Sequence, residues 1–157
     1  ALYWHVANKQ TLLAAMADEI LGEEQLTPTD DGGELARELL GWAHALRSKL
    51  LAHRDGAELV SSAMSVGLVT TDPSVQLASF LQDCGGCDSQ TARAASQALT
   101  HLVVGHVMDE QARRQLFELN VIDTFDGEAQ EIEFDVGVRL LVTGIRGASC
   151  VMKTHDA

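Results

Sequence analysis

The sequence predicts an all-α protein, and three observations support this fold class. The chain has only 2 prolines in 157 residues, so few positions interrupt a long helix. Its aromatic residues are 2 Trp, 1 Tyr and 4 Phe, which is few for a sheet protein whose strands favour such side chains. Apolar residues recur at spacings of three and four along most segments, as on one face of a helix.

Two amphipathic helices are predicted in the first third of the chain. The first spans residues 9–24 and follows Asn8, a candidate N-cap. A polar loop is expected next, and a second helix spans residues 34–53, with Gly56 placed to end it. The apolar stripes of the two helices are Leu12, Leu13, Met16, Ile20 and Leu21 in the first, and Leu35, Leu39, Trp42, Leu46 and Leu50 in the second.

The middle of the chain predicts three more segments. Residues 57–71 are weakly patterned and indicate a short helix followed by a loop. Pro73 suits the first position of the next helix, which Gly85-Gly86 would end. The longest helix runs from Asp88 or Ser89 to about Leu116, and it is apolar on almost every side over residues 99–108. Because a chain of this length has little interior to surround such a helix, we expect one side to meet another subunit.

The last element is ambiguous between a strand and a helix. Apolar residues alternate with polar ones from Glu131 to Leu140, which is the period of a strand. No other segment alternates convincingly, so a strand here would have no partner within the chain. We therefore predict a helix over residues 131–148, preceded by an acidic loop over 118–130.

Charge and cysteine content restrict the partners and the compartment. Asp and Glu number 23 against 11 Lys and Arg, a net charge of −12, so nucleic acid could be held only by a small, locally basic part. The chain has no membrane-spanning apolar run and no secretory signal pattern, which favours a cytoplasmic protein with reduced thiols. Cys84-Gly85-Gly86-Cys87 lacks the second ligand pair of a zinc site, so thiols in a helix-ending loop are expected.

Two blocks of sequence resemble the tetracycline-repressor (TetR) family. Residues 2–13, Leu-Tyr-Trp-His-Val-Ala-Asn-Lys-Gln-Thr-Leu-Leu, resemble the end of the DNA-reading helix and the start of the helix that connects it to the body. Residues 50–57, Leu-Leu-Ala-His-Arg-Asp-Gly-Ala, resemble the end of a later helix of the tetracycline repressors. Weaker matches are Gly105 with Asp109-Glu110-Gln111, and Phe134-x-x-Gly137 with Gly144.

The resemblance implies a TetR-like helical regulatory domain that forms a homodimer. Residues 1–8 would be the remnant of an N-terminal helix-turn-helix domain, and residues 9–157 the ligand-binding and dimerisation domain, with 9–24 as the connecting helix. Residues 88–116 and 131–148 of two copies would pair as a four-helix bundle. The predicted interface residues are Leu102, Gly105, His106, Gly137, Leu141 and Gly144.

The resemblance also implies a ligand site, although not a magnesium–drug site. Where tetracycline repressors carry drug-binding and metal-binding side chains, this chain has Gln25, Trp42, Leu46 and Val60, so we expect a more apolar site and no metal or cofactor. Judged from the residues alone, Trp42 is more typical of core packing, and His101 is equally typical of a core or interface histidine. The predicted ligand-binding residues are Trp42, Leu46, Val60, Met64, Gln76, Gln97, Thr100 and His101.

We therefore predict a transcriptional repressor, not an enzyme, that leaves its operator when a small, largely apolar ligand binds. Tyr3, His5 and Lys9 match family positions that lie against DNA. The expected partners are operator DNA, a small-molecule effector and a second copy of the chain, without a membrane. One alternative is a small helical metal protein or enzyme using His101, His106, Asp109 and Glu110, and another is a dimerisation module without a ligand.

Overall fold

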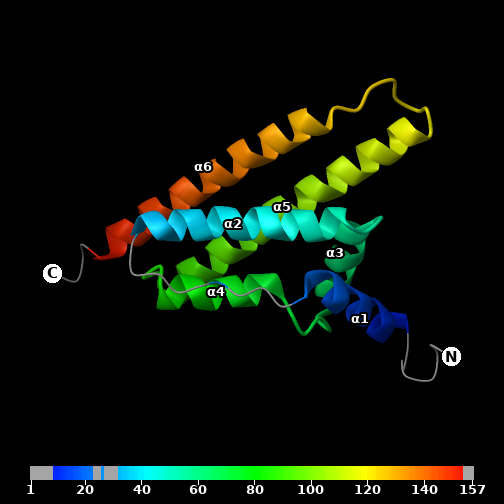
Figure 1. Ribbon diagram of the computed structural model, residues 1–157. Helices are drawn as coiled ribbons and strands as arrows, with labels where there is room; N and C mark the ends of the chain where they lie inside the picture. The colour runs from blue at the N-terminus through cyan, green and yellow to red at the C-terminus, as the bar shows by residue number, and fades with distance from the viewer. Residues whose placement is uncertain (1–8, 23–25, 27–31, 154–157) are drawn as a thin grey trace.

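The computed structural model describes residues 9–22, 26 and 32–153, with the side chains of 32–34 and 149–153 excluded. Within these residues the chain is helical and contains no strand, so the predicted all-α class is confirmed (Figure 1). None of these helices is both long and apolar enough to span a membrane. The helices are α1 (Lys9–Leu21), α2 (Gly32–Leu51), α3 (Gly56–Val66), α4 (Pro73–Asp83), α5 (Ser89–Glu118) and α6 (Gly127–Lys153).

α5 is the central helix of the structure. It contacts α2, α3, α4 and α6, while α1 packs mainly on α3. Figure 1 shows α5 and α6 as a long antiparallel pair joined by a loop that projects beyond the other helices, with α2 lying across them. The fully buried side chains that fill the interior include Leu39, Leu50, Val60, Leu77, Leu81, Leu99, Val103, Val107, Phe134 and Val138.

The ends of α1 and α2 differ from the predicted ends. α1 stops at Leu21 because Gly22 adopts a left-handed φ of 58°, and residues 23–24 of the predicted helix lie outside the described residues. α2 stops at Leu51, and Gly56 does not terminate it but begins α3. Glycine is needed there for close approach, since a Cβ atom at Gly56 would lie 2.6 Å from the carbonyl oxygen of Leu50.

Capping side chains explain where α4 and α5 begin. The carboxylate of Asp72 accepts a hydrogen bond from the Ser74 amide at 2.8 Å, directly before Pro73 at the first position of α4. The carboxylate of Asp88 accepts from the amides of Gln90 and Thr91 at 2.8 and 3.0 Å, which starts α5. α5 then continues two residues beyond the predicted end, to Glu118.

The Cys-Gly-Gly-Cys segment closes the end of α4. Gly86 has a left-handed φ of 65°, and the Cys87 amide donates to the Leu81 carbonyl at 3.2 Å, so the chain turns back over the last turn of α4. Cys87 is buried, Cys84 is half-buried, and the two do not form a disulfide. Their placement agrees with the predicted helix-ending loop.

The ambiguous last segment is helical, as predicted, and α6 begins earlier and ends later than residues 131–148. Its apparent alternation arises from two stripes, each with a spacing of four residues and offset from one another by two. Since two residues turn a helix by about 200°, the two stripes lie on nearly opposite faces. Phe134, Val138 and Val142 form the buried stripe, whereas Ile132, Val136 and Leu140 form the exposed one.

Candidate ligand-binding site

α3, α4 and α5 surround a cavity of about 240 Å³. α3 ends at Val66, where Gly67 turns the chain with a φ of 72°, and the following loop brings Asp72 and Ser74 to the cavity. Four of the predicted ligand-binding residues meet there, namely Met64, Gln97, Thr100 and His101. The lining is completed by Ser61, Ser65, Asp72, Ser74 and Val104.

The lining is more polar than the sequence predicts. Asp72 accepts from both the amide and the hydroxyl of Ser74, at 2.8 and 2.7 Å, so this carboxylate is fixed in position. The Thr100 hydroxyl donates to the Ser96 carbonyl at 2.8 Å. The side chains of Gln97 and His101 are exposed and form no hydrogen bond to other described residues, so their side-chain nitrogen and oxygen atoms are available to a bound molecule.

The other four predicted ligand-binding residues lie elsewhere. Trp42 and Leu46 are each 3% exposed and Val60 is 0% exposed, and all three belong to the apolar core. Gln76 is half-buried on α4, where its amide donates to the Asp72 carbonyl at 3.3 Å, but it does not line the cavity. The apolar stripe of α2 thus fills the interior, and ligand contact by these four residues stays a prediction.

Five lining residues were missed from the sequence, namely Val104 and four polar residues of α3 and the start of α4. The positions of the four polar residues explain both the omission and how they could have been found. Ser61 and Ser65 are four apart on α3 and flank Met64, so a polar stripe beside a predicted pocket residue was the available signal. Asp72 and Ser74 flank Pro73, which the sequence identifies only as the start of a helix. Their capping role and their place in the cavity wall are compatible, since the cap leaves the loop at the surface of the cavity.

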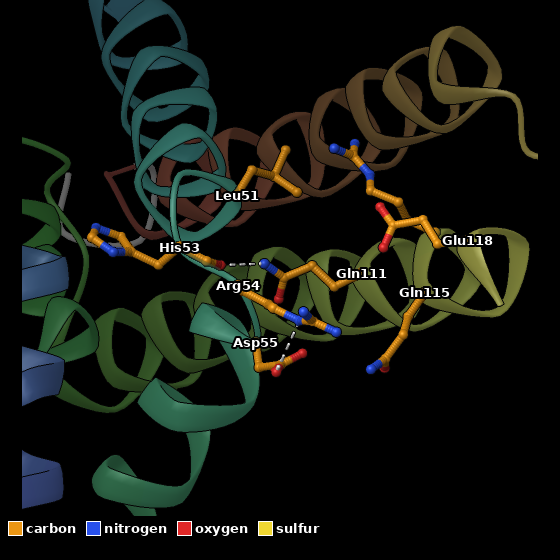
Figure 2. Close-up of a pocket in the computed structure, with 8 residues that line it drawn as sticks. Leu51, His53, Arg54, Asp55, Gln111, Gln115 and Glu118 are labelled. Carbon is orange, nitrogen blue, oxygen red and sulfur yellow. Dashed lines mark hydrogen bonds and ion pairs between the residues drawn. The ribbon is translucent and has the colours of Figure 1, made fainter.

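A second hollow, of about 330 Å³, lies where the turn between α2 and α3 meets α5 (Figure 2). The Gln111 side chain spans this junction. Its Nε2 donates to the carbonyls of Leu50 and His53 at 3.1 and 2.8 Å, and its Oε1 accepts from the Ala57 amide at 3.3 Å. The 50–57 block and Gln111, separately noted in the sequence, therefore meet and tie α2, α3 and α5 together.

The residues of the alternative metal site are not brought together. Glu110 is buried and bonds Arg47 at 2.8 Å and Arg114 at 3.3 Å. His106 instead bonds the Gln130 carbonyl at 3.0 Å, while His101 lies at the cavity. Among the residues that the structure describes, no group of three or more His, Cys, Asp or Glu side chains is arranged to hold a metal ion.

The predicted interface residues lie on the outer side of the α5–α6 pair. Gly105 and Gly144 are exposed, with open space beside their Cα atoms, and a Cβ atom at Gly137 would lie 3.8 Å from Leu102. Leu102 and Leu141 are half-buried, as is His106. Leu140 is 70% exposed and lies on the same face of α6 as these glycines, three residues from Gly137 and four from Gly144. Ile132 and Val136, the other exposed apolar residues of α6, instead line a hollow beside His44 of α2.

Of the predicted DNA-contacting residues, the structure describes only one. Lys9 is exposed at the first position of α1, where a helix N-terminus also favours an anion. Tyr3 and His5 lie outside the described residues.

Comparison with known proteins identifies the architecture. Residues 27–120 match the family model described as "Tetracyclin repressor-like, C-terminal domain". The chain is 31% identical to the tetracycline repressor protein class E of Escherichia coli over 161 aligned positions, which cover 91% of this chain and 72% of that protein. The chain belongs to the tetracycline repressor-like family. It is thus a member of a family of transcriptional regulators and carries their C-terminal domain.

Solved structures of this family share the fold. BioQ of Mycobacterium smegmatis has a TM-score of 0.77 and 33% identity, over 94% of this chain and 78% of that one. BioQ with its natural double-stranded DNA operator has a TM-score of 0.68 and 35% identity, over 93% and 76%. TetR (class A) in complex with 5a,6-anhydrotetracycline and magnesium has a TM-score of 0.67 and 28% identity, over 92% and 79%.

The magnesium–drug chelate of that family member does not fit this chain. Val60 stands where the resemblance places a metal-binding histidine, and its side chain is apolar and 0% exposed. A magnesium–drug chelate needs an oxygen or imidazole ligand from the protein, which a buried valine does not supply.

Proposed function

We propose that this chain is the regulatory part of a transcriptional repressor that binds operator DNA as a homodimer and leaves it when a small molecule occupies the α3–α4–α5 cavity. Family membership supports the regulatory role, and the solved BioQ–operator and TetR–drug structures support the two kinds of partner. In this proposal the protein binds and releases its partners in the cytoplasm without catalysing a reaction.

The observation that carries the proposal is the cavity itself. Trp42, Leu46 and Val60 are buried in the apolar core, so the space of about 240 Å³ among α3, α4 and α5 does not arise from loose packing of these residues. Its volume is near the lower end of ordinary small-molecule sites, which begin at about 300 Å³.

The lining favours an effector with several hydrogen-bonding groups. Gln97 and His101 offer donors and acceptors without partners among the described residues, and three serines lie around them. Met64 and Val104 supply apolar contacts. A small polar molecule therefore suits the cavity better than the largely apolar ligand expected from the sequence.

Repression and release require differential binding. Moving a regulator from about 99% operator-competent to about 1% requires roughly 5.5 kcal/mol of preference for the released form. Two identical sites in a dimer share this requirement, so each contributes about 2.7 kcal/mol, within the usual coupling range. The effector must therefore bind the DNA-free form much more tightly than the operator-bound form.

The proposal is tested on the regulator that includes the DNA-binding head. A screen of small polar compounds by thermal shift identifies a candidate, whose affinity is then measured with and without operator by calorimetry. His101→Ala is expected to weaken compound binding about tenfold, because a cavity hydrogen bond is lost, whereas the exposed His53→Ala leaves it unchanged. Equal compound affinity with and without operator would rule out the repressor mechanism.

We propose the outer side of α5 and α6 as the dimer interface. On α6 this side exposes the large apolar side chain of Leu140 between Gly137 and Gly144, and on α5 Gly105 is exposed with open space beside it. Two copies paired here form a four-helix bundle, which would hold two heads at half-sites about 34 Å apart.

Replacing Leu140, which lies on this side, by a charged residue tests the proposed dimer interface. Leu140→Glu is expected to raise the dimer dissociation constant by about two orders of magnitude or more, because a carboxylate would be buried without a partner. Val75→Glu is the matched control, since Val75 is 63% exposed on α4, away from this face. Sedimentation velocity over a range of concentrations distinguishes the two, and an unchanged dimer of Leu140→Glu would place the interface elsewhere.

A further inference from the structure

α1, the helix that connects to the DNA-binding head in the proposed function, has a hydrogen-bonded anchor near its C-terminal end. Its first three residues, 9–11, are exposed. Near its C-terminal end, the Leu21 carbonyl accepts a hydrogen bond from Lys49 Nζ of α2 at 2.6 Å. The residues that α1 buries are Ala14, Ala17, Ile20 and Leu21, and the last three of them lie within its final five residues.

Asp18 adds a polar anchor in the same half of α1. Its Oδ1 accepts from the Thr70 amide at 2.9 Å, the Thr71 amide at 3.0 Å and the Thr71 hydroxyl at 2.8 Å. Its Oδ2 accepts from the Thr70 hydroxyl at 2.7 Å. One carboxylate thus receives every side-chain and backbone donor of two consecutive residues in the α3–α4 loop. We refer to Asp18, Thr70 and Thr71 as the Asp18 cluster.

The Asp18 cluster is directly continuous with the cavity wall. Thr71 is followed by Asp72, which lines the cavity, and Ser74 lines it two residues later. Asp72 also begins α4, because its carbonyl accepts from the amides of Val75 and Gln76. Neighbouring Cα atoms are held about 3.8 Å apart, so a displacement of the wall at Asp72 is passed on to Thr71 by the covalent chain.

We propose that the Asp18 cluster couples occupancy of the cavity to the orientation of α1, with Asp18 as a positioning residue. This inference rests on the proposed function and names the regulation of its site. A molecule in the cavity displaces the Asp72–Ser74 wall, and the threonines move the carboxylate that they hold. Lys9 lies about 13.5 Å along the helix axis from Asp18, so a tilt near Asp18 is enlarged at the end that carries the head.

The coupling can be measured without DNA or a known effector, by filling the cavity with a side chain. Ser61→Leu adds bulk to the lining, whereas Ser62→Leu adds the same bulk to an exposed neighbour outside it. The readout is amide hydrogen exchange of α1 and of Thr70 and Thr71, whose amides donate to Asp18. Each substitution is made in the wild-type chain and in an Asp18→Ala background.

We expect Ser61→Leu to speed exchange in α1 and at the two threonines by about fivefold or more in the wild-type chain, and Ser62→Leu by less than about twofold. In the Asp18→Ala background the effect of Ser61→Leu on α1 is expected to fall below about twofold, since coupled sites are not additive. Thr71→Val removes one donor and keeps the fold, and should reduce the coupling partly if Asp18→Ala does not fold.

The inference would be overturned if Ser61→Leu and Asp18→Ala had additive effects on hydrogen exchange in α1. It would also be overturned if Ser61→Leu and Ser62→Leu changed that exchange equally. Either outcome would assign the Asp18 cluster a structural role alone. These outcomes are independent of the proposed function, which is tested by operator and compound binding. A regulator that releases DNA on binding a compound, but shows no coupling through Asp18, would refute this inference and leave the proposed function standing.

Discussion

The two sides of the central helix α5 are built differently. On the side of α2 and α6, charged and aromatic side chains are packed into a filled interior around Phe134. The guanidinium of Arg47 lies 5.3 Å from the Phe134 ring centre, and the rings of His44 and His106 lie 5.2 and 5.3 Å from it. On the side of α3 and α4, the same helix lines an open, polar cavity.

The difference indicates which part of the molecule is suited to move. A filled interior with a buried ion pair changes shape only at a large cost, because close-packed side chains have no space to shift into. A cavity whose wall is a short capped loop can be deformed at lower cost. We therefore regard α2, α5 and α6 as the fixed scaffold, and the α3–α4 loop with α1 as the responsive part.

The largest expected effect comes from breaking the ion pair of the scaffold. Glu110→Ala leaves the Arg47 guanidinium buried without its carboxylate, and Arg47 Nε already has no hydrogen-bond partner among the described residues. We expect the free energy of unfolding to fall by about 3–5 kcal/mol, which urea denaturation at a fixed protein concentration would measure.

Glu19→Ala is the matched control for this change. Glu19 is exposed on α1, and its removal is expected to alter stability by no more than about 0.5 kcal/mol. If Glu110→Ala were equally mild, the side of α2 and α6 would be no more rigid than the cavity side, and the contrast between the two would not hold.

A smaller effect is expected at the junction between the two sides. Gln111→Ala removes the amide that bonds the Leu50 and His53 carbonyls and the Ala57 amide, so the end of α2 and the start of α3 lose their shared partner. We expect a loss of about 2 kcal/mol in urea denaturation, whereas Gln115→Ala, one turn later and exposed, should cost less than about 0.5 kcal/mol. Equal losses would show that Gln111 does not join the two sides.

The sequence predicts the scaffold better than the cavity. Helical spacing of apolar residues identifies α2, because the side chains that a helix buries recur every three or four residues. The helix α6 was predicted instead because a strand there would have no partner within the chain. The two stripes of α6 show the limit of such spacing, since Ile132 and Phe134 give the same pattern although one is exposed and the other buried. The two stripes can be distinguished only by the helices that each one contacts in the folded structure.

The cavity lining depends on contacts that periodicity does not record. Trp42 and Val60 match ligand positions by resemblance, yet here they fill the core, whereas Ser61 and Asp72 reach the cavity through a loop whose path no local pattern predicts. The Asp18 cluster is similar, since it joins a helix to residues more than fifty positions later in the chain. Such long-range polar contacts were beyond the reach of spacing arguments.

The smallest effect concerns the responsive part and depends on pH. Burial alone would raise the pKa of Asp18, but hydrogen bonds from Thr71 and Thr70 outweigh it and hold the pKa below its usual value of 3.8. A carboxyl group whose pKa is lower in the folded state stabilises the fold above the unfolded-state pKa. That contribution is lost as the pH falls through the folded-state pKa.

We expect Asp18→Ala to cost about 1 kcal/mol at neutral pH, with the difference from wild type constant down to about pH 5 and shrinking as the pH falls below about 4. Urea denaturation of both proteins at several pH values gives this difference. Asp88 and Asp135 also have lowered pKa values, through hydrogen bonds from Thr91 and Arg139 respectively. Both residues are present in the two proteins, so their pH-dependent contributions cancel in the difference between the unfolding free energies. A difference that stayed constant to pH 3 would mean that the Asp18 carboxylate contributes no charge-dependent stabilisation, so that α1 is held by its apolar contacts and Lys49 instead.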